Sequence, residues 1–219
     1  MNISDEQVRA GQAVYTKRSL RLYDLVVLGL TNRLVWKCPT PGLLAHYNRH
    51  VSANHLDVGV GTGYFLERCR FPSDAPRIAL LDINRSSLAF AAARIAQRTP
   101  EKYLRNVLEP LSIDAANFDS VGLNYLLHCL PGAIGSKSVV LDHLKAHMNP
   151  GAVLFGSTLL QGGVSRGWAA RRLMAFYNGK GIFCNRDDHL QGLEQALAQR
   201  FPDHSIQVAG CAALFSARL

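Results

Sequence analysis

Apolar and polar positions divide the chain into a helical first part and a longer part of alternating strands and helices. Between residues 4 and 50 the apolar positions recur with helical spacing, and three helices are predicted. From His55 onward, apolar runs of strand length alternate with helical stretches. This alternation is typical of βαβ units that build a parallel sheet. The predicted helices begin at Ser4, at Ser19 and at Thr40-Pro41.

The second part supplies enough strands for a doubly wound sheet. An amphipathic helix and two short strands broken at Gly210 end the chain, and a basic helix is expected within 159–183. No internal repeat or linker interrupts the pattern, so we expect one domain over 1–219, with a helical lid at 1–50 and an α/β core at 51–219. The remaining strands are predicted at 54–60, 77–83, 103–109, 119–126 and 151–157, with helices at 64–70, 86–97 and 136–148.

Composition narrows the class of protein. With 219 residues and 48% apolar composition, the chain can bury one sizeable core. The net charge of +8 is spread out, with its densest group at 166–172, which favours an ordinary solvated face over a nucleic-acid stripe. Five cysteines without C-x-x-C spacing indicate neither a disulfide framework nor a zinc site. No apolar run reaches membrane-spanning length and the N-terminus lacks signal-peptide order, so a cytoplasmic location is expected.

Three glycines follow the first predicted strand, where a doubly wound sheet binds its ligands. Gly59, Gly61 and Gly63 lie in the turn into the next helix, and glycine lets a backbone approach a ligand closely. Dinucleotide-binding folds use G-x-G-x-x-G, but Tyr64 stands at the last glycine position. No G-K-[ST] follows, which excludes a phosphate-binding P-loop.

The remaining pattern, D-x-G-x-G-x-G over Asp57–Gly63, resembles the cofactor motif of class I S-adenosylmethionine-dependent methyltransferases. "NPGAVLFGST" is similar to the family's turn and fifth strand, with Ala152 in place of a second glycine. The resemblance implies a Rossmann-like, mostly parallel seven-stranded sheet with an antiparallel last strand. It also implies S-adenosyl-L-methionine as cofactor and S-adenosyl-L-homocysteine as product.

The same resemblance assigns the cofactor-binding residues. Asp82 ends the second strand, 19 residues after Gly63, and would accept both ribose hydroxyls, while Ile83 packs on the adenine. Each acid also has a structural alternative, because Asp57 can tie down the turn, Asp82 can cap a helix and Glu109 can be a solvated loop residue. The full set implied is Asp57, Gly59, Gly61, Gly63, Asp82, Ile83, Glu109 near the adenine, and Asn124 at the border of the methyl group.

Methyl transfer needs little chemical catalysis from the protein, because the methyl group of a sulfonium is already activated. Holding the nucleophile in line within a dry pocket supplies most of the catalysis. His128, just after the fourth strand, is the candidate general base, with a border role beside the cofactor as the alternative. His143 and His147 have metal-ligand spacing on a helix, but no third ligand is near, so we expect no metal and a solvent-facing pair.

The acceptor site is expected in the N-terminal helices and the segment after the fifth strand. The stretch "NYLLHCLPG" lacks the [DN]-P-P-[YF] and Pro-Cys motifs of DNA methyltransferases, so a small metabolite is preferred over nucleic acid as the acceptor. The resemblance to the family implies oxygen as the methylated atom. An RNA or protein methyltransferase and a non-catalytic member stay as alternatives, and the N-terminal helices leave a homodimer open. The candidate substrate-binding residues are Tyr15, Tyr23, Trp36, Arg171 and Tyr177, whose alternatives are core packing and solvated charge.

Overall fold

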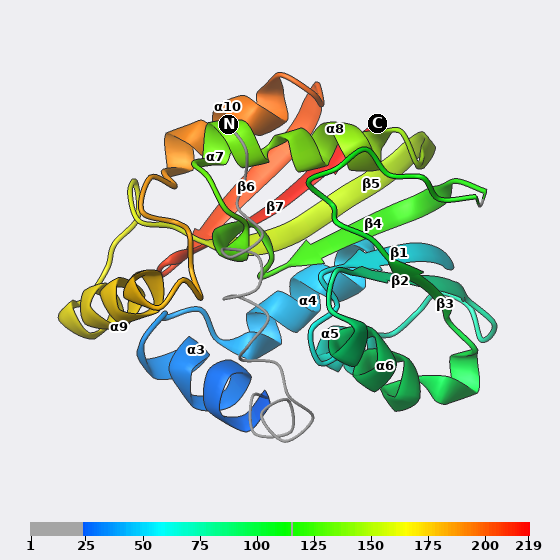
Figure 1. Cartoon of the computed structure of the whole chain (residues 1–219), viewed down its shortest axis with the longest axis horizontal. Helices are drawn as coiled ribbons and strands as arrows, with labels where there is room; N and C mark the ends of the chain where they lie inside the picture. Colours follow the sequence, from blue (N-terminus) through cyan, green and yellow to red (C-terminus); the bar gives the residue numbers. More distant parts are fainter. Residues whose placement is uncertain (1–23, 115) are drawn as a thin grey trace.

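A seven-stranded sheet forms the centre of the computed structural model, which describes residues 24–114 and 116–219 (Figure 1). The strand order is β3-β2-β1-β4-β5-β7-β6, and only β7 runs antiparallel to its two neighbours. This confirms the predicted doubly wound sheet with its antiparallel last strand. The strands are β1 (Asn54–Val58), β2 (Arg77–Asp82), β3 (Glu101–Leu104), β4 (Phe118–Asn124), β5 (Met148–Leu159), β6 (Asp203–Ala209) and β7 (Ala212–Arg218).

Helices cover both faces of the sheet (Figure 1). On one face lie α7 (Ile134–Lys137), α8 (Val139–Lys145) and α10 (Leu190–Ala198), and on the other lie α4 (Thr40–His50), α5 (Tyr64–Arg68) and α6 (Arg85–Arg94). The segments α3 (Asn32–Leu34) and α9 (Trp168–Gly179) lie on the side toward which β4 points. Shorter pieces are the π-helical η1 (Asp24–Thr31) and the 3₁₀ turns η2 (Ala96–Arg98) and η3 (Leu127–Cys129).

Each face of the sheet has its own apolar core. The side chains of α8 and α10 pack with β4, β5 and β7, whereas those of α4, α5 and α6 pack with β2 and with Phe155 of β5. β2 is buried on both faces, which explains why residues 78–81 read as a continuous apolar run without alternation. β1 is also buried, but it has polar His55 and Asp57 between its apolar residues. None of the described helices has the length and apolar character needed to cross a membrane.

Several predicted boundaries were wrong, and each error has a local cause. The third strand ends at Leu104, because residues 105–113 form a loop that bonds to α8 rather than to a neighbouring strand. The helix predicted over 136–148 is two helices and stops at Lys145, and β5 begins at Met148, ahead of Pro150. Thr40 does not cap α4 as predicted; Pro39 holds that position, and the Thr40 hydroxyl bonds to Leu28 O.

The helical first part is not only a covering layer. α4 packs directly on the sheet with Leu43 and Tyr47 fully buried. A lid role for the N-terminal helices stays a prediction, because the first predicted helix lies outside the described residues.

A fully buried ion pair connects the segment after β4 with the segment before α10. Lys137 Nζ lies 2.6 Å from Asp188 Oδ2 and donates to the carbonyl oxygens of Leu130 and Cys184 over 3.2 and 2.9 Å. Among the described residues, no group other than Lys137 compensates the buried Asp188 carboxylate, so the ammonium group is its partner. Burial raises the pKa of Asp188 to about 6, and Lys137 opposes that rise.

We expect Lys137→Met to lower the free energy of unfolding by about 3–5 kcal/mol at neutral pH, because it leaves the Asp188 carboxylate buried without a cation. Urea denaturation measures this change. The loss should shrink at about pH 5, where a protonated Asp188 needs no cation. Exposed Lys102 supplies the matched control, and Lys102→Met should leave stability within about 0.5 kcal/mol. Equal losses in the two variants would contradict the role given to the ion pair.

Candidate active site

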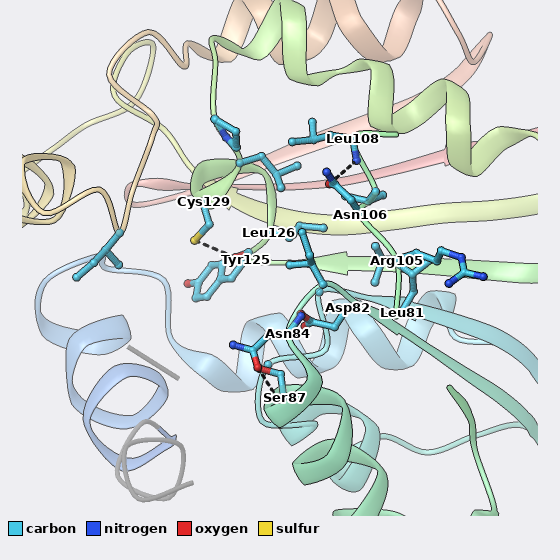
Figure 2. A pocket seen from close by; sticks show the side chains of 18 residues that line it. Leu81, Asp82, Asn84, Ser87, Arg105, Asn106, Leu108, Tyr125, Leu126 and Cys129 are labelled. Atoms are coloured by element: carbon cyan, nitrogen blue, oxygen red, sulfur yellow. Dashed lines mark hydrogen bonds between the residues drawn. The ribbon is translucent and has the colours of Figure 1, made fainter. Parts of the chain in front are cut away.

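A pocket opens at the carboxyl ends of β1, β2 and β4, where the strand order reverses (Figure 2). Four segments form its walls: the glycine turn after β1, the end of β2, the loop after β3 and the loop after β4. Ile182, in the segment after α9, completes the lining. The hollow contains about 880 Å³ of empty space, part of it open to solvent. This is the position at which doubly wound sheets bind their ligands.

The three glycines of the turn have different structural reasons. All have positive φ, at +68° for Gly59, +52° for Gly61 and +70° for Gly63. A Cβ at Gly59 would lie 2.7 Å from Leu126 Cδ1, and one at Gly63 would lie 3.0 Å from the backbone of Ala91, so both glycines serve packing. At Gly61 no atom of the described residues lies within 4 Å of that position. Gly61 and Gly59 line the pocket, and Gly63 starts α5 outside it.

Asp82 lies in the pocket wall at the end of β2, as predicted, and its carboxylate is held by the backbone (Figure 2). Asn84 N–H donates to Oδ1 over 2.8 Å, and Gly61 N–H also bonds to the carboxylate. Burial raises the pKa of Asp82 to about 6, against the effect of these donors. The alternative helix-cap role belongs instead to Asn84, whose side chain accepts from Ser86 and Ser87.

Asp57 is nearly buried beneath the glycine turn and is not part of the pocket lining. The Tyr47 hydroxyl donates to its Oδ2 over 2.6 Å, and His55 Nε2 lies 3.5 Å from the same oxygen. The acid of the glycine motif is therefore held from the α4 side of the sheet.

The adenine side of the predicted site is only partly as expected. Ile83 lines the pocket with 38% of its surface exposed, as an apolar platform requires. Glu109 is exposed, lies outside the lining and accepts from Asn106 Nδ2 over 2.9 Å. Residues 105–108 line this wall instead (Figure 2). The prediction missed them because it read 103–109 as a strand.

The two histidines predicted on a helix contact this loop and do not form the solvent-facing pair that was expected; His143 lies in α8, and His147 lies in the turn after it. His143 Nδ1 bonds to Val107 O over 2.9 Å, and His147 Nε2 bonds to Leu111 O over 3.2 Å. Each imidazole satisfies a carbonyl of the loop, and Val107 is itself part of the pocket wall.

The turn after β4 holds Asn124 and a strained tyrosine. Asn124 Oδ1 accepts from Ser157 Oγ over 3.1 Å, but its buried Nδ2 has no hydrogen-bond partner among the described residues. Tyr125 has φ +56°, a conformation that L-residues rarely adopt, and it lines the pocket. Its hydroxyl donates to Asn32 Oδ1 over 3.1 Å, which ties the pocket to the N-terminal segment.

His128 lies in η3, 3% exposed and outside the pocket lining. Its Nδ1 accepts from Leu159 N–H over 3.3 Å, so in the neutral ring Nε2 carries the proton. Burial lowers the pKa of His128 to about 3, and the ring packs 4.6 Å from that of Phe183. The ring is neutral at pH 7, and its accepting nitrogen already has a partner.

None of the three predicted acceptor residues in the described part of the chain lines the pocket. Trp36 is 1% exposed and packs 6.2 Å from the Phe183 ring, so the expectation that it stacks on an acceptor was wrong. Arg171 is exposed on α9 and donates to Arg166 O, and Tyr177 packs against Phe183. Neither lines the pocket. Tyr15 and Tyr23 lie outside the described residues.

Other residues line the pocket after the end of β4. Beyond Tyr125 the wall consists of Leu126, Cys129, Leu130 and Pro131. Burial raises the pKa of Cys129 to about 12, so it is an apolar wall residue and not a thiolate nucleophile. The sequence could have indicated these wall residues, because the stretch "NYLLHCLPG" directly follows a strand at the ligand-binding edge of the sheet.

The polar atoms of the site fit a nucleoside with a polar tail. Asp82 offers carboxylate oxygens at the rim, and Ile83, Val107 and Leu108 provide apolar surface for a base. The open space above Gly61 admits a ligand close to the backbone. Asn124, which ends β4 and is not among the residues that line the pocket, has a buried Nδ2 donor without a partner among the described residues. The described residues contain no cluster of His, Cys, Asp or Glu suited to a metal ion.

Comparison with known proteins agrees with this geometry. Residues 56–154 match a family model described as a methyltransferase domain. The chain is 41% identical over 216 residues to demethylluteothin O-methyltransferase of Streptomyces thioluteus, covering 99% of this chain and 94% of that protein. It is 35% identical over 209 residues to the physcion biosynthesis cluster O-methyltransferase of Aspergillus chevalieri, covering 94% of each.

Solved structures share the fold at low identity. The DhpI-SAH complex superposes with a TM-score of 0.69 at 13% identity, covering 99% of this chain and 98% of that one. An O-methyltransferase family protein from Burkholderia thailandensis gives 0.66 at 15% identity, covering 97% of this chain and 62% of that one. With the matched domain, the relatives and the pocket at the turn of the D-x-G-x-G-x-G motif, this chain belongs to the class I S-adenosylmethionine-dependent methyltransferases of small molecules.

Proposed function

We propose that the protein transfers the methyl group of S-adenosyl-L-methionine to an oxygen atom of a small organic acceptor. The observation that carries this proposal is the 41% identity, over 99% of the chain, to a protein named as an O-methyltransferase. Other relatives at 32–35% identity carry O-methyltransferase names as well. The geometry supports it, because the pocket combines a nucleoside-binding rim with an apolar wall.

The sheet order suggests how the cofactor lies. Its adenine belongs against the loop after β3, where residues 106–108 and Ile83 line the pocket. Its ribose then reaches Asp82 at the end of β2, and the sulfonium and amino-acid part lies over the glycine turn, near Asn124. The acceptor enters from the side of Tyr125, Cys129 and Ile182.

The bound cofactor supplies an activated methyl group, and the protein's part is to position the acceptor and exclude water. Leu126, Leu130 and Ile182 form an apolar wall on the acceptor side, and an apolar wall disfavours water beside the acceptor oxygen. Strained Tyr125, tied to Asn32, gives that wall a single conformation.

His128 as general base stays a prediction, and the border role has more support. A base must be neutral, and burial keeps the imidazole neutral at pH 7. With a pKa of about 3, however, it accepts a proton weakly, and Leu159 N–H already occupies Nδ1. We therefore place most of the catalytic effect in positioning rather than in proton transfer.

The remaining partner assignments stay predictions. A cytoplasmic location and a preference for a small molecule over nucleic acid rest on the sequence argument alone, which leaves a homodimer through the N-terminal helices open. Arg171 and Tyr177 contact the acceptor only if the segment containing α9 folds over the pocket.

Turnover tests the proposed function directly. Incubation of the protein with S-adenosyl-L-methionine and a panel of hydroxyl-bearing small molecules should yield S-adenosyl-L-homocysteine and a product one methyl group heavier, as detected by mass spectrometry. Matched amines and thiols separate oxygen from other acceptor atoms, and RNA and protein substrates cover the alternative class. Cofactor binding with no turnover on any acceptor would identify a non-catalytic member.

Cofactor binding should depend on Asp82. Loss of two hydrogen bonds to a charged acceptor predicts that Asp82→Ala weakens S-adenosyl-L-homocysteine binding at least about 100-fold in calorimetric titration. Asp119, exposed at the opposite end of β4, provides the control, and Asp119→Ala should bind like wild type. NAD should bind to neither of these two variants. Unchanged affinity in Asp82→Ala would place the ribose elsewhere.

The affinity for S-adenosyl-L-homocysteine should also decrease when the pH is lowered. Because the pKa of Asp82 is raised to about 6, its carboxylate is ionised above that value and protonated below it. Only the ionised form accepts hydrogen bonds from both ribose hydroxyls. Calorimetry from about pH 7.5 to about pH 5 should show affinity decreasing below pH 6, by up to about tenfold per unit. Asp82→Asn should bind weakly without this decrease, and a wild-type affinity that rises on acidification would refute the assignment.

A further inference from the structure

A chain of buried hydrogen bonds runs through the sheet beneath the glycine turn and ends on Asp57. Ser120 Oγ lies 2.8 Å from His55 Nδ1, and His55 Nε2 lies 2.8 Å from the Tyr47 hydroxyl. That hydroxyl donates to Asp57 Oδ2 over 2.6 Å. Ser120, His55 and Tyr47 are each 0% exposed. The chain joins β4, β1 and α4, and the proposed methyl transfer has so far used none of it except Asp57.

The donors in this chain have a defined direction. Tyr47 has one hydroxyl proton and gives it to Asp57, so His55 Nε2 must be the donor to the Tyr47 oxygen. Burial raises the pKa of Tyr47 well above its ordinary value, which keeps that proton in place. Hydrogen bonds in such a chain polarise one another, so His55 strengthens the bond that Tyr47 makes to the carboxylate.

Packing prevents the chain from rearranging. The Tyr47 ring stacks on Phe65, with centroids 5.6 Å apart, and meets Phe155 edge-on at 5.1 Å. On the other side of His55, β4 has Gly122, where a Cβ would lie 3.1 Å from His55 Cε1. The groups that hold Asp57 therefore have one arrangement.

The hydrogen bonds from Tyr47 and His55 involve only one of the two Asp57 carboxylate oxygens. Oδ2 takes the contacts from Tyr47 and His55, and Oδ1 takes no part in them. The Asp57 side chain keeps 10% of its surface exposed, although its partner His55 is completely buried. Because Asp57 is anchored through Oδ2, Oδ1 is the oxygen that would accept a hydrogen bond from a ligand lying over the turn.

The sheet order identifies the part of the ligand that lies there. Asp82 ends β2 and Asp57 lies in β1, which is the next strand toward β4. If Asp82 holds the ribose, as in the proposed function on which this inference rests, the part beyond the ribose passes over β1. We propose that Tyr47 and His55 are positioning residues for the cofactor: they orient Asp57 toward its cationic amino-acid part.

Two ligands separate this role from a general structural one. S-adenosyl-L-homocysteine contains the amino-acid part, and 5′-methylthioadenosine has the same nucleoside without it. We expect Tyr47→Phe to weaken binding of S-adenosyl-L-homocysteine by about tenfold or more in calorimetry, because a hydrogen bond to a charged group is lost. Binding of 5′-methylthioadenosine should stay within about twofold of wild type.

A double-mutant cycle tests the part played by His55. His55→Leu should weaken S-adenosyl-L-homocysteine binding in the wild-type background but have no further effect in Tyr47→Phe, because it acts through the Tyr47 hydroxyl. His55→Gln, which keeps a donor, should restore affinity. The matched control is Tyr103→Phe, since Tyr103 donates to the Glu101 carboxylate over the same 2.6 Å away from the pocket. This control should bind both ligands like wild type.

The outcomes distinguish failure of this inference from failure of the proposed function. If wild type binds S-adenosyl-L-homocysteine and Tyr47→Phe binds it equally well, the positioning role is wrong. Equal weakening of both ligands, with a lowered melting temperature, would make Tyr47 a core residue only. If the wild-type protein binds neither ligand, the cofactor assignment itself fails.

Discussion

The close approach of the glycine turn to its neighbours is the constraint on which the site depends. Gly59 N–H bonds to Leu81 O over 2.8 Å, and a Cβ at Gly59 would lie 2.7 Å from Leu126 Cδ1. This packing brings the end of β1 against both β2 and the loop after β4. As a result, Asp82 and Tyr125, which are 43 positions apart in the numbering, line one pocket. A side chain at Gly59 would be strained at φ +68° and would displace the end of the Leu126 side chain.

Burial decides which polar groups of the site suit which chemistry. Desolvation raises the pKa of Asp82 and of Cys129 and lowers that of His128, in each case against the charged form. A pocket that disfavours new charge on its own side chains is poorly suited to proton transfer and well suited to displacement at an activated carbon, where alignment matters most. The weak basicity of His128 is therefore consistent with methyl transfer.

The N-terminal helical part contributes to the site from beneath as well as from the side. Tyr47 of α4 bonds to the acid of the glycine motif, and Asn32 of α3 holds the strained Tyr125. Trp36, expected at an acceptor, is instead a core residue. Aromatic residues in amphipathic helices bury the largest apolar areas, so the sheet face rather than the ligand determines where these side chains go.

The parallel sheet, the glycine turn and the position of Asp82 could be predicted from the sequence. These features depend on local patterns, namely apolar runs, glycines that need positive φ and an acid that ends a strand. The antiparallel last strand was implied by the family resemblance. Three features became visible only in the folded chain: residues 105–108 replace Glu109 in the pocket wall, Trp36 and His128 are buried, and His55 and Tyr47 reach Asp57. Those contacts join separate elements, and no spacing along one chain encodes the distance between two packed side chains.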